Sequence, residues 1–262
     1  MDNTKKIKTL SVLNLIGYLL TLTLNGLANG LPINGRNTGE LADLYPNLFV
    51  PAGFTFSIWG VIYLWLGVWV VYQLVQAFRQ GGNTGTERIG IVFFLSCIFN
   101  ASWILAWHYE LVFLSVLIML SLLGSLITIY LRLGIGKGSP DIRTRALVQA
   151  PFSIYLGWIT IATVANATAL LVDQNWSGWG IDQVTWTIIM VLAATLITLA
   201  VLYRRRDFIY AAVPIWAFFG IASKRLTDPI VLDGLIYTLY AVMGVIALGA
   251  ILAIIFRPKA TN

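Results

Sequence analysis

Aromatic and amide side chains recur at helical spacing in three apolar stretches of the chain. The members that share a face within each stretch are Trp59 and Tyr63, then Asn100 and Trp103, then Trp158, Ala162 and Asn166. Because residues three or four apart lie on one side of a helix, each face would place an aromatic ring beside a polar or small group. Two interpretations follow. The faces are helix-packing surfaces with interhelical hydrogen bonds, or they line a cavity for a flat, mostly apolar ligand that a few polar groups orient.

Ionisable side chains, in contrast, are missing from these apolar stretches. Proton coupling or acid–base catalysis inside a membrane needs such groups, which cost at least about 2.5 kcal/mol each to place there. The single histidine, His108, lies beside Glu110 at the end of an apolar stretch, and the single cysteine is Cys97. We favour an interfacial polar role for His108 over axial ligation of a haem iron. The pattern argues against a proton pump, a metalloenzyme or an obligatory cofactor.

Composition places the chain in a membrane. Hydrophobic residues make up 58% and charged residues 11%, whereas soluble domains carry about 25% charge. A spanning helix needs about 20 apolar residues. Uncharged stretches of suitable length occupy residues 9–31, 52–78, 89–107, 111–131, 146–172, 183–203, 208–223 and 234–256. We therefore expect an all-α integral membrane protein of eight spans. The stretch 208–223 is short and contains Pro214, so crossing and re-entrant arrangements are both open for it.

The distribution of Lys and Arg predicts orientation. With the amino terminus inside, the outer loops hold only Arg36, Lys224 and Arg225, and the other fourteen of the 17 basic residues fall inside. Since basic residues of short loops stay in the cytoplasm, both termini should be cytoplasmic. The net charge of +6 then reflects this bias and attraction to anionic lipid headgroups, without a nucleic-acid partner. The charges are scattered through short loops, and no single basic face is expected.

Two connecting features bear on assembly. The longest outer connection, residues 32–51, holds Gly35, Gly39, Pro46 and Pro51. It could fold over the mouth of the bundle as a lid or form a plain solvated linker. Gly26 and Gly30 form a Gly-x-x-x-Gly pattern, which could support pairing of helices in a homodimer.

Three motifs carry a resemblance to a known family. They are Pro51-Ala-Gly-Phe-Thr-Phe-Ser-Ile-Trp59-Gly-Val-Ile-Tyr63, Asn100-Ala-Ser-Trp103, and Tyr155-Leu-Gly-Trp158-Ile-Thr-Ile-Ala162-Thr-Val-Ala-Asn166. Over residues 8–172 the chain resembles the TspO/translocator family of tryptophan-rich sensory proteins, also called peripheral-type benzodiazepine receptors. It departs from the pattern at Ile154, where the family has Pro, and at Trp107-His108, where it has two phenylalanines.

The resemblance implies a five-helix ligand-binding bundle at residues 1–172. Residues 173–262, with about three further spans, have no counterpart in the five-helix core. Family ligands are porphyrins, haem and, in some relatives, sterols or benzodiazepine-type drugs, and a bacterial inner (plasma) membrane is implied. The positions that match the family's pocket residues are Pro51, Trp59, Tyr63, Asn100, Trp103, Trp158, Ala162 and Asn166.

Three functions remain in competition. We favour a membrane-embedded binding or sensory protein for a porphyrin, haem or another flat apolar ligand, with the lipid bilayer as its other partner. A transporter of such a ligand is the first alternative, for which the last spans would form a second half. A porphyrin-degrading enzyme is the second alternative, and the chain shows no acid–base pair that would favour it.

Overall fold

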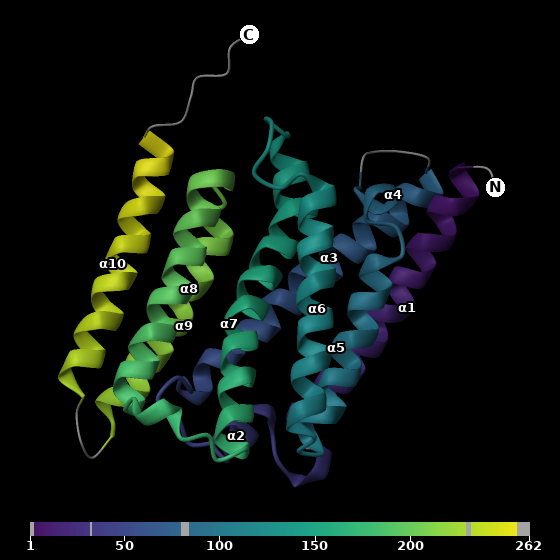
Figure 1. Cartoon of the computed structure of the whole chain (residues 1–262). Coiled ribbons are helices and arrows are strands. Elements are labelled where there is room, and N and C mark those ends of the chain that lie inside the picture. Colours follow the sequence, from purple (N-terminus) through teal and green to yellow (C-terminus); the bar gives the residue numbers. More distant parts are fainter. Residues whose placement is uncertain (1–2, 32, 80–83, 229–231, 256–262) are drawn as a thin grey trace.

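The computed structural model describes residues 3–31, 33–79, 84–228 and 232–255. In these ranges the chain is almost entirely helical, without a strand. Long helices run side by side through the molecule (Figure 1). They are α1 (Asn3–Gly30), α3 (Ile58–Arg79), α5 (Val92–His108), α6 (Val112–Leu133), α7 (Ala150–Asp173), α8 (Gln183–Arg205), α9 (Phe208–Leu226) and α10 (Asp233–Ile255).

Each of the eight predicted apolar stretches forms one of these helices, so the all-α membrane fold is confirmed. Six helical segments of the described chain are long and apolar enough to cross a bilayer. Of the other two helices, α5 has 17 residues and α9 has 19. At 1.5 Å per residue, α9 is about 28 Å long, close to the thickness of the hydrocarbon layer. It continues as a helix through Pro214.

Short helical turns connect the long helices. The first connection holds η1 (Ile33–Gly35), α2 (Thr38–Ala42) and η2 (Gly53–Ser57). The remaining turns are α4 (Thr86–Ile89), the π-helical η3 (Thr144–Gln149) and η4 (Gly178–Gly180). Asparagine or aspartate side chains cap the first turns of α2, α8 and α9. These residue types are preferred there because their oxygens accept hydrogen bonds from free backbone amides. The Asp182 carboxylate accepts hydrogen bonds from the Thr185 amide and hydroxyl at 3.0 and 2.7 Å, and these bonds lower the pKa of Asp182.

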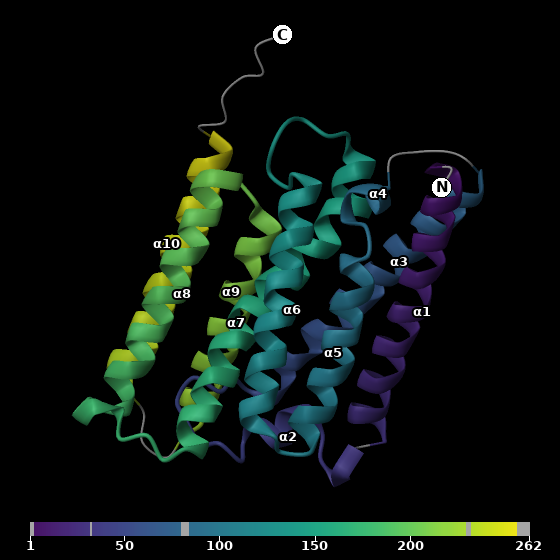
Figure 2. The same ribbon diagram turned by 45° about the vertical axis from the view of Figure 1, so that its right-hand side comes forward.

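The two ends of the bundle differ in what they carry. We call the end where α1 begins and α10 ends the proximal end, and the opposite end the distal end (Figures 1 and 2). The basic residues assigned to the outer loops lie near the distal end, and the other described basic residues lie near the proximal end. Arg257 and Lys259, which belong to the predicted inner set, lie outside the described residues. Which side of the membrane the proximal end faces stays a prediction.

Helix α7, the fifth long helix, joins the first four long helices to the last three. It packs against α6 on one side and α9 on the other. Gly157 of α7 allows this close approach, because a Cβ there would lie 3.0 Å from the Val213 Cβ and 3.1 Å from the Tyr210 carbonyl oxygen. The Tyr210 hydroxyl also bonds the Thr160 hydroxyl at 3.1 Å. Small residues at such contacts are typical of helix packing in membranes.

Candidate ligand-binding site

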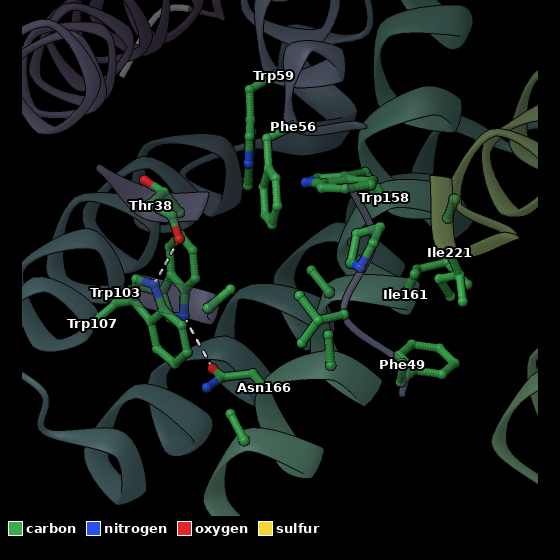
Figure 3. Close-up of a pocket in the computed structure, with 17 residues that line it drawn as sticks. Thr38, Phe49, Phe56, Trp59, Trp103, Trp107, Trp158, Ile161, Asn166 and Ile221 are labelled. Atoms are coloured by element: carbon green, nitrogen blue, oxygen red, sulfur yellow. Dashed lines mark hydrogen bonds between the residues drawn. The ribbon is translucent and has the colours of Figure 1, made fainter. Parts of the chain in front are cut away.

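A cavity of about 60 Å³ lies in the distal half of the bundle. Its walls come from α2, the segment around η2, α3, α5, α7 and α9, and we call it the aromatic pocket (Figure 3). Six of the eight predicted site residues line it. They are Pro51, Trp59, Trp103, Trp158, Ala162 and Asn166.

Four indole rings dominate the walls. Trp103 and Trp107, four residues apart on α5, stack with an interplanar angle of 13° and centroids 6.2 Å apart. Trp59 is tilted by 31° from Trp103 at 6.2 Å, and it meets Trp158 edge to face at 6.0 Å. The pocket therefore presents extended π-surfaces, which favour a flat apolar guest.

The Asn166 side chain already has partners within the protein. Its Oδ1 accepts a 3.0 Å bond from Trp103 Nε1, drawn in Figure 3, and its Nδ2 donates to the Ser115 hydroxyl at 2.9 Å. A direct ligand contact for Asn166 stays a prediction, and Ser115 of α6 was not among the predicted site residues. In this geometry Asn166 fixes the orientation of Trp103.

Two polar groups of the pocket remain without a hydrogen-bond partner among the described residues. These are the Nε1–H of Trp158 and the hydroxyl of Thr38, and both side chains are buried. Figure 3 shows the Trp158 nitrogen directed toward the side chains of Phe56 and Trp59. A buried donor without a partner costs about 1–3 kcal/mol, so Trp158 is available to an acceptor on a ligand.

Tyr63 and Asn100, also predicted as pocket residues, do not line the aromatic pocket. Asn100 Nδ2 donates to the Tyr155 hydroxyl at 2.8 Å, and Asn100 Oδ1 accepts from Asn25 Nδ2 at 2.7 Å. Tyr63 stacks on Trp59, with centroids 5.3 Å apart and an angle of 18°. In this arrangement the two residues support the pocket from behind, and a direct ligand contact for either stays a prediction.

The connection between α1 and α3 covers the pocket. Thr38 and Ala42 of α2, and Phe49, Val50 and Phe56 further along, all line the cavity. We call residues 38–57 the cover. Of the two sequence interpretations of this connection, the structure thus shows a segment folded over the bundle. Apart from Pro51, its lining residues were not predicted, because loop residues follow no periodic pattern that would reveal the direction of their side chains.

Helix α9 forms a further wall, through Ala217 and Ile221. It also holds the cover. The Ala52 amide donates to the Gly220 carbonyl oxygen at 3.0 Å, and Trp216 Nε1 donates to the Thr55 carbonyl oxygen at 3.0 Å. The pocket wall therefore contains residues from both predicted regions, 1–172 and 173–262.

An ion pair between Lys224 and Asp43 adds a third link between α9 and the cover. Its side chains are 26% and 60% exposed, so it lies at the surface. Arg36, which belongs to the same connection between α1 and α3, pairs with Glu110 at 3.3 Å and does not line the pocket.

His108 is likewise outside the pocket lining. Its ring is buried, and Nδ1 lies 2.7 Å from the Ile104 carbonyl oxygen one turn earlier on α5. Among the described residues there is no group of three or more His, Cys, Asp or Glu side chains that could hold a metal ion.

Comparison with known proteins adds one match. The sequence model of a family described as TSPO-like protein matches residues 11–252. This match extends past the first five long helices and reaches well into α10. Neither the curated proteins nor the solved structures compared with the chain gave a match.

Proposed function

The chain belongs to the TSPO-like protein family, and from this premise and the aromatic pocket we propose that it binds a flat, mostly apolar ligand, with porphyrin or haem as the representative. Family membership and the apolar helices make it a membrane protein of a ligand-binding or transport type. The observation that carries the finer proposal is a wall of four indoles, one of which, Trp158, has a buried N–H without a partner among the described residues.

The chemistry of the walls selects the ligand class. Stacked or edge-to-face aromatic pairs contribute about 0.5–1.5 kcal/mol each beyond the burial of apolar area. Trp103 and Trp158 both contact Trp59, and a ring system inserted between them would make aromatic contacts of the same kind. Its acceptor atom, such as a carbonyl or carboxylate oxygen, would satisfy Trp158 Nε1. A small polar ligand would gain little from these walls.

The size of the pocket sets a condition on binding. A cavity of about 60 Å³ is well below the 300–1,000 Å³ of pockets for drug-sized ligands. The indoles are held on long helices, whereas the cover is joined to α9 by two hydrogen bonds and one exposed ion pair. We therefore assign the necessary widening to the cover. If only a fraction of molecules is open, the apparent affinity is the intrinsic affinity multiplied by that fraction.

Protoporphyrin titration tests the proposal. Purified protein in detergent should show saturable quenching of tryptophan fluorescence. Trp158→Phe keeps an aromatic ring and removes the N–H, so the affinity should fall about five- to tenfold, as expected for one hydrogen bond of about 1 kcal/mol or slightly more.

Trp179→Phe is the matched control, because Trp179 is 78% exposed and contacts Trp176 and Trp186 away from the pocket. It removes one of the ten tryptophans and should leave the affinity unchanged. Wild-type protein that shows no saturable quenching by protoporphyrin or haem would exclude tetrapyrroles as ligands. An equal loss of protoporphyrin affinity in Trp158→Phe and Trp179→Phe would show that Trp158 does not bind the ligand.

A further inference from the structure

A second, wider cleft opens at the proximal end, between the α6–α7 connection and the turn from α8 to α9. It has a volume of about 490 Å³ and is lined by five basic side chains. They are Lys137, Arg145, Arg204, Arg205 and Arg206. We call it the basic cleft. The sequence predicted basic residues scattered over separate loops, but the structure brings these five together at one cavity.

The acidic residue of the cleft wall is committed to the fold. Asp207 Oδ2 accepts a 2.9 Å bond from the Tyr130 hydroxyl, and Oδ1 accepts a 3.1 Å bond from the Tyr210 amide. These bonds attach α9 to α6 and cap the start of α9. Asp207 supplies at most one negative charge against the five basic side chains of the cleft.

Three of the five cations have no side-chain partner among the described residues. Within the described chain, neither an ion pair nor a side-chain hydrogen bond engages Lys137, Arg145 or Arg204. Arg205 donates to the Ile135 carbonyl oxygen at 3.4 Å and lies 5.8 Å from the centre of the Tyr130 ring, so it is held in place. The cleft consequently has a strong excess of positive charge.

Glycines set the shape of the cleft. Gly134, Gly136 and Gly138 all have positive φ, at +65°, +78° and +66°. A Cβ on Gly136 would lie only 2.0 Å from the Arg205 carbonyl oxygen. The α6–α7 connection can therefore lie directly against the end of α8, which brings Lys137 and Arg145 to the same cavity as Arg204.

The position and rim of the cleft indicate the kind of anion. Tyr203 and Phe208 line it and are 86% and 36% exposed. Aromatic residues beside basic ones at the end of a membrane helix are typical of the headgroup layer. Positive-inside bias alone predicts basic residues at this end but does not require five of them to share one cavity.

From these observations we infer that the basic cleft binds the headgroup phosphate of an anionic phospholipid. Lys137, Arg145 and Arg204 surround the phosphate, and Tyr203 and Phe208 contact the apolar part of the lipid. The ligand would join the α6–α7 connection to the α8–α9 turn and so tie the last three helices to the first five. This inference does not depend on what occupies the aromatic pocket.

Lipid-dependent thermal stability tests the inference. Phosphatidylglycerol added to protein in detergent should raise the unfolding midpoint in a saturable way, because a ligand of the folded state stabilises it. Phosphatidylcholine of the same chain length and inorganic phosphate serve as separate arms, and both should give smaller shifts. A shift of equal size with inorganic phosphate would assign the cleft to a soluble phosphate and overturn the lipid assignment.

Variants locate the effect. The triple variant Lys137→Gln, Arg145→Gln, Arg204→Gln should bind phosphatidylglycerol about 100-fold more weakly, at about fivefold for each basic residue. The matched control Lys5→Gln, Lys6→Gln, Lys8→Gln removes the same charge from α1 at the same end and should keep the wild-type affinity.

Equal losses in the two triple variants would show general attraction to a basic surface and would overturn the inference. Retained protoporphyrin quenching, where wild type shows it, serves as one check that the cleft variant is folded, and its unfolding midpoint without lipid serves as another. The single variant Arg204→Gln, with an expected fivefold loss, gives the same test if the triple variant does not fold. An unchanged affinity in that single variant would also contradict the inference.

Discussion

The aromatic pocket and the basic cleft differ in what lines them, although α7 and α9 contribute residues to both. The pocket encloses about 60 Å³ between indole rings, of which Trp103 donates to Asn166 and Trp107 to the Thr38 carbonyl oxygen. The cleft is about eight times larger, at 490 Å³, and several of its cations have no partner in the described chain. The pocket is defined by shape, and the cleft by charge.

This difference has a consequence for substitutions. At the pocket, a change in packing should alter stability and ligand binding together, because the same contacts serve both. At the cleft, removing a cation should alter binding and leave the fold almost unchanged, since exposed charges contribute little to stability. Three substitutions at the pocket end test this separation, beginning with the largest expected effect.

Gly220→Ala should have the largest effect. A Cβ there would lie 2.0 Å from the Thr55 hydroxyl oxygen and 2.9 Å from the Thr55 Cβ, so α9 and the cover must separate. Overpacking of this kind costs about 1–3 kcal/mol. Thermal unfolding should show this loss, and protoporphyrin affinity should change with it. Gly244→Ala on α10 is the control, because a Cβ there meets no other atom within 4 Å; it should be neutral or slightly stabilising. Equal midpoints for the two variants would contradict the close contact.

Asn166→Leu should have the next largest effect. It leaves Trp103 Nε1 without its 3.0 Å partner, at a cost of about 1–3 kcal/mol, and it frees the Trp103 ring, so ligand affinity should fall as well. Asn100→Leu is the informative comparison, since Asn100 also makes buried hydrogen bonds but does not line the pocket. It should lower the unfolding midpoint by a similar amount with a smaller change in protoporphyrin affinity. A greater affinity loss in Asn100→Leu would make Asn100 a ligand contact.

Lys224→Gln should have the smallest effect on stability. It removes the surface ion pair with Asp43, and exposed pairs contribute about 0–1 kcal/mol. The cover would lose one of its links to α9, so protoporphyrin should associate faster in stopped-flow quenching while the midpoint stays nearly constant. Arg36→Gln, which breaks the exposed pair with Glu110, is the control and should leave the association rate unchanged. A large stability loss in Lys224→Gln would show that charge also fixes the pocket.

Part of the pocket was predictable because its residues follow a helical period. Trp158, Ala162 and Asn166 lie four residues apart, and their common face on α7 meets the cavity in the structure. The sequence could not distinguish contact from support. Asn100 and Asn166 are both buried amides on predicted faces, yet one bonds Tyr155 behind the pocket and the other holds Trp103 within its wall.

The contribution of α9 could not be predicted from its residues. Ala217 and Ile221 line the pocket, but in a membrane helix an apolar residue suits lipid and protein interior equally. The same limit applies to Phe49 and Phe56 of the cover, whose loop conformation has no sequence period.

Taken alone, the sequence determined that the chain is an all-α membrane protein with eight apolar helices, because hydrocarbon leaves the backbone few other ways to satisfy its hydrogen bonds. It also determined which aromatic residues share helix faces, because that depends only on local spacing. The tertiary structure decided that α9 closes the pocket and that Lys137, Arg145 and Arg204 share one cleft. These groups are separated by long helices along the chain. The packing of α7 against α9 and the close approach of the α6–α7 connection to the end of α8 bring them together.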